Sequence, residues 1–177
     1  MNELSMVLAV SQATPSFDSL FLTEFNQIFG YVQRLVGDLA AAHRLTEESF
    51  HQLARYYRKG RKPIEARALL YLIATQRARE QARKGDKRSL VQRLFARGEA
   101  PLVEFAAEDT RGLATDTSQR ALSTLEFGSR VVLLLHDYCG LSYSETARAA
   151  GIGKSAAARE LDRARHEFKQ AYDYIKF

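Results

Sequence analysis

The residues best suited to chemistry in this chain lie within positions 140–165, in the sequence GLSYSETARAAGIGKSAAARELDRAR. Ser142 is typical of a residue that caps a first short helix, and Gly151 and Gly153 supply a tight turn after it. A second helix then begins at or just after Lys154. This order of parts predicts a helix-turn-helix, whose second helix can lie in a DNA groove.

Cationic and hydroxyl side chains recur on the second helix, while small and apolar side chains can form its packed side. The residues that we expect to face DNA are Lys154, Ser155, Arg159 and Arg163. The same pattern also fits an ordinary helical hairpin with solvated charges, because short helix-turn-helix matches are common by chance.

Charge is strongly segregated along the 177 residues, which carry a net charge of +5. The net charge is −4 for residues 1–50, +10 for 51–100, −3 for 101–150 and +2 for 151–177. Basic clusters attract phosphate backbones, so two basic segments predict contact with nucleic acid at two places. A solvated charged face is the alternative for the first of them.

Apolar residues recur at steps of three and four, which predicts an all-α protein. We expect helices at 17–36 and 46–58 and a third helix from Pro63 to about Gly85, which together form the first domain. The periodicity weakens from Arg88 to about residue 117. Regular patterning resumes before the helix-turn-helix, so a linker joins two small helical domains.

Several classes of protein do not fit the sequence. Cys139 is the only cysteine, which excludes an intrachain disulfide and a cysteine metal cluster. The four histidines lack metal-ligand spacing and no phosphate-binding glycine loop is present, so we expect no metal, no cofactor and no enzyme activity. The apolar runs are too short to span a membrane and the first ten residues do not resemble a secretory signal. We therefore expect a cytoplasmic protein.

The order of these parts resembles the extracytoplasmic-function (ECF) sigma factors of the sigma-70 family. The sequence ALSTLEFGSRVVLLLHDYCGLSYSETARAAGIGKSAAARELDRAR is similar to sigma region 4, and the Phe-rich first helix, LTEESF and LLYLIATQRARE are similar to sigma region 2. The resemblance implies a region 2 domain at 12–88, a linker at 89–117 and a region 4 domain at 118–177. It also implies a promoter-specific sigma factor that acts with bacterial core RNA polymerase.

In the family, the basic third helix of region 2 and its flanking residues contact the minus-ten promoter element, and region 4 contacts the minus-thirty-five element. Gln76 stands where the family usually has Asn, and Glu160 where it often has Arg. The resemblance implies the following region 2 contacts with DNA: Arg61, Lys62, Gln76, Arg77, Arg79, Arg83, Lys84 and Lys87.

One departure concerns the surface that docks on the beta-prime clamp helices of polymerase. The family normally carries an acidic DAED-type motif there, and this chain has Ala41, His43 and Arg44 at the acidic positions, followed by Glu47 and Glu48. The loss of negative charge reverses the local field, which predicts poor binding to core polymerase.

Thr46 offers a way to restore that charge, because a phosphothreonine adds about −1.5 to −2 charge near neutral pH. Some members of the family that lack the acidic motif are linked to Ser/Thr protein kinases, which makes Thr46 the expected phosphorylation site and Ser49 the second choice. A plain helix N-cap is the other interpretation of Thr46. For the whole chain, the alternative to a sigma factor is a helix-turn-helix regulator that never joins core polymerase.

Overall fold

The computed structural model describes residues 16–60, 65–95 and 117–176, with no description of the side chains of residues 85–95. Every regular element in these ranges is helical, which confirms the predicted all-α class. The first half of the chain forms α2 (Phe17–Val36), α3 (Leu39–Arg58) and α4 (Ala66–Phe95). The second half forms α5 (Thr117–Thr124), α6 (Phe127–Leu133), η1 (Leu134–Tyr138), α7 (Tyr143–Ala150) and α8 (Lys154–Lys176).

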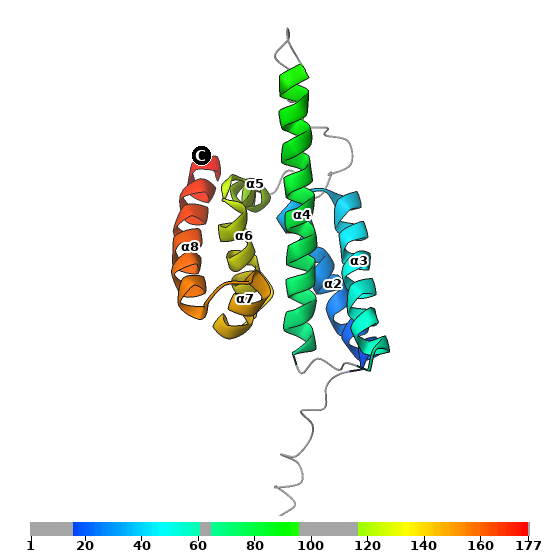
Figure 1. The fold of residues 1–177 in the computed structure, drawn as a ribbon. Coiled ribbons are helices and arrows are strands. Elements are labelled where there is room, and N and C mark those ends of the chain that lie inside the picture. Colours follow the sequence, from blue (N-terminus) through cyan, green and yellow to red (C-terminus); the bar gives the residue numbers. More distant parts are fainter. Residues whose placement is uncertain (1–15, 61–64, 96–116, 177) are drawn as a thin grey trace, which may run out of the picture.

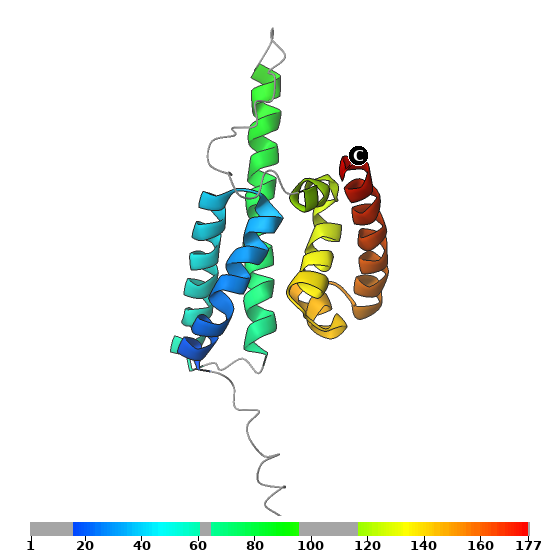
Figure 2. The ribbon, with the colours of Figure 1, turned by 180° about the vertical axis from the view of Figure 1, so that it is seen from behind.

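Helix α4, which belongs to the first half, stands in the middle of the molecule (Figure 1). Helices α2 and α3 lie on one side of it and α6, α7 and α8 on the other, and the view from behind shows the same order (Figure 2). Buried apolar residues of both halves form one continuous cluster, with Leu35 and Leu70 from the first half and Leu135 and Leu161 from the second. The two predicted domains are therefore packed together through a shared core.

Helix α2 has the predicted bounds, because both of its ends are fixed by local caps. The backbone N–H of Ser19 donates to Oγ of Ser16 at 3.1 Å. Gly37 ends the helix in the left-handed conformation, with φ of 74°, which glycine adopts without steric cost.

Helix α3 begins seven residues earlier than the predicted start at Thr46, at Leu39. The side chain of Asp38 accepts a hydrogen bond from the backbone N–H of Ala41 and caps the helix. The alanines that follow are the strongest helix formers, so the helix propagates from this cap. Thr46 is therefore not an N-cap, and its side chain is wholly buried in the middle of the helix.

Helix α4 extends beyond Gly85, where the sequence predicted its end, and reaches Phe95. One glycine inside a helix costs only about 1 kcal/mol, so a strong helical context carries the helix past it. The predicted end of the first domain at residue 88 falls within this helix, and most of the predicted linker, 96–116, lies outside the described residues. The domain bounds themselves stay a prediction.

The helix-turn-helix has the predicted caps. The Oγ of Ser142 accepts from the backbone N–H of Glu145, and Glu145 Oε2 accepts from the backbone N–H of Ser142 at 2.9 Å, which makes a capping box. Gly151 ends α7 with φ of 72°, and α8 starts at Lys154 as expected. Ala150 and Ala157 are both buried, and their small side chains let α7 and α8 approach closely.

We predict that Thr46→Val raises the free energy of unfolding by up to about 1 kcal/mol. The Oγ1 of Thr46 is buried and has no hydrogen-bond partner among the described residues, so replacing the hydroxyl with a methyl removes an uncompensated polar group. Urea denaturation followed by circular dichroism measures the change.

Asp38→Ala is the matched control, because it removes the actual cap of α3 and should lower the same free energy by about 1 kcal/mol. A loss of stability in Thr46→Val as large as that in Asp38→Ala would contradict the assignment of the cap.

Candidate nucleic-acid interface

Four side chains of helix α8 are predicted to contact DNA. Three of them are exposed to solvent and have no ion pair among the described residues. Lys154, Ser155 and Arg159 are exposed, and no ion pair within the described part of the chain engages the two cations. On the opposite side of the helix, Ala157 and Leu161 are buried against the rest of the second half. The helix therefore has one packed face and one cationic face, as DNA recognition by a helix-turn-helix requires.

Arg163, the fourth predicted contact, is exposed but held by carboxylates. Its guanidinium lies 2.6 Å from Glu160, 3.7 Å from Glu126 and 3.8 Å from Glu167. The hydrogen bond and charge of Glu160 raise the pKa of Arg163. Glu160 also accepts a hydrogen bond from Oγ of Ser129 at 2.8 Å. Arg163 therefore offers DNA a largely neutralised charge, and the Glu at position 160 explains why.

Helix α4 carries the predicted contacts of the first half on two different faces. Gln76, Arg83 and Lys84 are exposed. Arg77 is partly buried against α3, where it donates to Gln52 at 2.8 Å. Arg61, Lys62 and the side chain of Lys87 lie outside the described residues.

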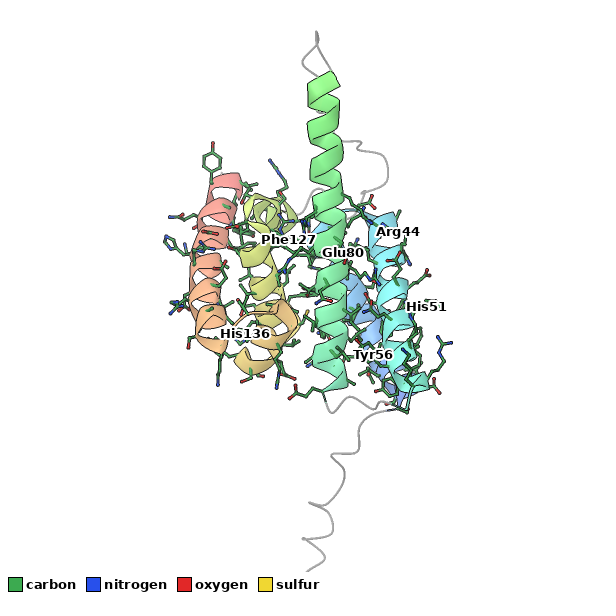
Figure 3. All side chains as sticks on the ribbon, in the orientation of Figure 1. Arg44, His51, Tyr56, Glu80, Phe127 and His136 are labelled. Carbon is green, nitrogen blue, oxygen red and sulfur yellow. The ribbon has the colours of Figure 1, made fainter. Side chains whose placement is uncertain are left out.

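Arg79 is also exposed but faces the second half of the chain. Its guanidinium carbon lies 5.7 Å from the ring centroid of Phe127, within the range of a cation–π contact. Phe127 lies beside α4 in Figure 3. Only part of the basic surface of α4 is therefore available to nucleic acid in this arrangement.

The predicted polymerase-binding residues do not share one surface. Ala41 is buried, whereas His43 and Glu47 are exposed. The Arg44 guanidinium is 3.1 Å from a carboxylate oxygen of Glu48, so this pair contributes little net charge. The side chains at the start of α3 therefore carry little net charge. Among the described residues, Glu47 is the carboxylate of this segment that has no ion-pair partner.

Neither predicted phosphorylation site is accessible in this structure. Thr46 and Ser49 each have 0% exposed area. The Ser49 hydroxyl donates to the carbonyl oxygen of Leu45 at 2.6 Å. A kinase could reach either hydroxyl only after the middle of α3 moves away from its neighbours.

The sequence did not point to the residues that join the two halves. We use "the junction" for the contacts made by Arg34, Arg67, Arg130, Tyr138 and Cys139. Arg34 stacks on the ring of Tyr138, with its guanidinium carbon 4.2 Å from the ring centroid, and donates to the Tyr138 hydroxyl at 3.1 Å. A methyl group at Gly30 would lie too close to that hydroxyl, so the exposed Tyr138 side chain would have to shift to accommodate it.

Two partly buried arginines complete the junction. Arg67 lies 3.0 Å from a Glu24 carboxylate oxygen and donates to the carbonyl oxygen of Cys139 at 3.0 Å. Arg130 donates to the carbonyl oxygens of Leu35 at 2.9 Å and of Leu125 at 3.0 Å. Cations inside apolar helices are the only sequence feature that could have indicated these contacts, since such charges require partners when buried.

The π-helical turn η1 brings Tyr138 and Cys139 to the junction. The backbone N–H of Cys139 bonds to the carbonyl oxygen of Leu134 at 2.9 Å, a five-residue step that marks a π turn. The Cys139 thiol is buried beside Tyr71 of α4, and burial raises the pKa of Cys139 to about 12. The thiol is therefore protected for as long as the two halves stay together.

The comparisons with known proteins agree with this geometry. Residues 118–167 match the family described as Sigma-70, region 4. This region 4 segment holds α7, the turn and α8 as far as residue 167. No sequence among curated proteins matches the chain.

A similar solved structure is the co-crystal structure of the sigma factor RpoE in complex with the anti-sigma factor NepR from Bartonella quintana. The TM-score is 0.69 at 18% identity, over 89% of this chain and 96% of that chain. At this identity the likeness shows a common fold. The chain therefore holds a segment that matches sigma-70 region 4, within a fold shared with a solved sigma factor.

No helix in the described ranges is long and apolar enough to cross a bilayer. Across residues 16–60, 65–95 and 117–176, His, Cys, Asp and Glu nowhere gather in a group of three that could hold a metal ion.

We predict that Gly30→Ala makes Cys139 react faster with a thiol reagent, by roughly tenfold at pH 8, because the added methyl displaces Tyr138 and opens the junction. The chain has a single cysteine, so the rate measured by absorbance reports this position alone.

Gly153→Ala is the matched control, since a methyl there meets nothing within 4 Å. Rapid labelling of the unsubstituted protein, at the rate of a free thiol, would contradict the closed junction.

Proposed function

We propose that this protein is an RNA polymerase sigma factor that directs promoter-specific transcription initiation in the bacterial cytoplasm. The observation that carries the proposal is the exposed cationic face of α8, formed by Lys154, Ser155 and Arg159 within the segment that matches region 4. Arginine and lysine side chains read guanine edges or bind phosphates from such a helix. The exposed residues of α4, Gln76 and Arg83, would supply the second contact, with melted promoter DNA.

The proposal includes core RNA polymerase as a partner, through the beta-prime clamp helices and the start of α3. Support comes from the region 4 match and from the fold shared with a sigma factor. The start of α3 lacks the negative charge of the family motif, because Ala41, His43 and Arg44 stand at the acidic positions and Glu48 is paired with Arg44. We therefore expect weak binding to core polymerase by the unmodified protein.

Phosphorylation of Thr46 by a Ser/Thr kinase, with Ser49 as the alternative site, is the activation step that we propose. A phosphate on α3 would add the missing negative charge. The burial of both hydroxyls sets a condition on this step: the kinase must act on a state in which α3 has partly separated from α2 and α4. Once added, a phosphate cannot return to the buried position, so the modification would also hold that region open.

A second candidate function is a helix-turn-helix regulator that binds promoters without polymerase. The weak charge of the α3 start favours it, because a protein that never docks on polymerase needs no acidic surface there. An anti-sigma partner, as in the complex of RpoE with NepR, is a further regulatory possibility that belongs to the sigma-factor proposal.

We expect Arg159→Ala to reduce promoter-specific transcripts by about 5- to 150-fold while leaving association with core polymerase unchanged. The loss of one base-reading or phosphate-binding arginine should weaken promoter binding by about 1–3 kcal/mol. In vitro transcription on genomic DNA fragments, with protein isolated from cells in which it is active, measures the first effect. Size-exclusion chromatography of the same protein with core polymerase measures the second.

Arg120→Ala is the matched control, since Arg120 is exposed on α5 and outside the cationic face. Specific promoter binding with no association with core polymerase, whether or not the protein is phosphorylated, would favour the regulator instead.

We expect an added phosphate in the intact mass of the protein from cells in which it is active, and its loss in Thr46→Val. The valine variant is suitable because it should fold at least as stably as the unsubstituted chain. An unmodified mass in active cells, or full activity of Thr46→Val together with Ser49→Ala, would contradict phosphorylation control and leave the sigma-factor proposal intact.

A further inference from the structure

The cations of helix α8 fall into two groups along its length. Lys154 and Arg159, in the first turns, are exposed and have no ion pair among the described residues. Each of the next three Lys and Arg residues is paired with a carboxylate: Arg163 lies 2.6 Å from Glu160, Arg165 lies 2.6 Å from Asp137 and Lys169 lies 2.6 Å from Asp173. The free positive charge of the helix therefore ends at Arg159, and the first paired cation follows Glu160.

Glu160 is held by helix α6 as well as by Arg163. The hydroxyl of Ser129, a buried residue of α6, donates to Oε1 of Glu160 at 2.8 Å, and Nη2 of Arg163 donates to the same oxygen at 2.6 Å. Burial alone would raise the pKa of Glu160, but these two hydrogen bonds outweigh it and lower that pKa. The carboxylate is therefore a fixed negative charge at the contact between α8 and α6.

The position of Arg163 on the helix would suit a contact with DNA. It comes four residues after Arg159, on the same side of α8 and about 6 Å further along the axis. Its guanidinium is instead turned toward the start of α6, where Glu126 lies 3.7 Å away, and Glu167 lies 3.8 Å away on α8. A phosphate that approached Arg163 would meet these carboxylates together with Glu160, so the local field repels it.

We propose that Glu160 is a positioning residue that ends the DNA-contacting face of α8 at Arg159, because it withholds Arg163 from the phosphate backbone. Phosphate contacts supply affinity for any DNA sequence, whereas base contacts supply specificity. The loss of one phosphate contact therefore lowers sequence-independent binding and leaves recognition to the first turns of α8. The inference rests on the proposed function, in that α8 must bind DNA, and it applies to the sigma factor and to the regulator alike.

The test is a double-mutant cycle, measured by fluorescence anisotropy with the full-length protein and a labelled DNA duplex of mixed sequence. We expect Glu160→Gln to tighten binding by about fivefold or more and to steepen the plot of log affinity against log salt concentration by about 0.9, the value of one further phosphate contact. Arg163→Gln alone should change the affinity by less than about twofold, but combined with Glu160→Gln it should remove the whole gain.

Asp162→Asn is the matched control for the removal of a negative charge. Asp162 is exposed on α8 and has no ion pair among the described residues. Any change in affinity that this variant causes should be the same with and without Arg163→Gln. The glutamine at position 160 keeps an oxygen that can accept from Ser129, so the contact between α8 and α6 is retained, which circular dichroism checks.

Equal effects of Arg163→Gln in the presence and absence of Glu160→Gln would overturn the inference, because the gain would then come from the removed charge and not from a released arginine. A gain without a steeper salt dependence would overturn it as well. If Arg159→Ala weakens binding to the duplex but the cycle shows no coupling, the proposed function stands and this inference fails. If no variant binds the duplex, both fail.

Discussion

The ion pair between Glu24 of α2 and Arg67 of α4 is the interaction on which the arrangement of the two halves depends. Glu24 is only 9% exposed, and burying a charge is costly unless another charge and further hydrogen bonds compensate it. Burial alone would lower the pKa of Arg67, but Glu24 and Tyr71 outweigh it and raise that pKa, which keeps the arginine charged. The Nη2 of Arg67 donates to the carbonyl oxygen of Cys139, so the second half supplies part of the compensation.

Local features made parts of the fold predictable from sequence. The bounds of α2, the capping box at Ser142 and the turn at Gly151 all depend on residues within a few positions of one another. The sequence predicts the start of α3 at Thr46, which is wrong because Asp38 caps the helix and starts it at Leu39. The burial of Thr46 is set by packing between helices, which no local pattern reports.

In the candidate site, too, the sequence predicts the features that depend on nearby residues and misses those that depend on distant ones. The exposed cations Lys154 and Arg159 follow from helical periodicity and a glycine turn, so the sequence was enough to find them. The neutralisation of Arg163 depends in part on Glu126, which lies 37 positions earlier in the chain. The stacking of Arg34 on Tyr138 joins residues 104 positions apart. Contacts of this range require knowledge of how the halves pack, which composition and spacing do not provide.

The acceptors at the junction are mostly carbonyl oxygens at helix ends. Arg34 and Leu35 lie in the last turn of α2, and Cys139 follows η1; their oxygens accept from Gln119, Arg130 and Arg67 respectively. The last carbonyls of a helix have no partner within the helix, and water satisfies them as well as a side chain does. Separation of the halves would therefore exchange protein donors for water at these oxygens at little cost, so most of the free energy that resists separation comes from the apolar core that the halves share.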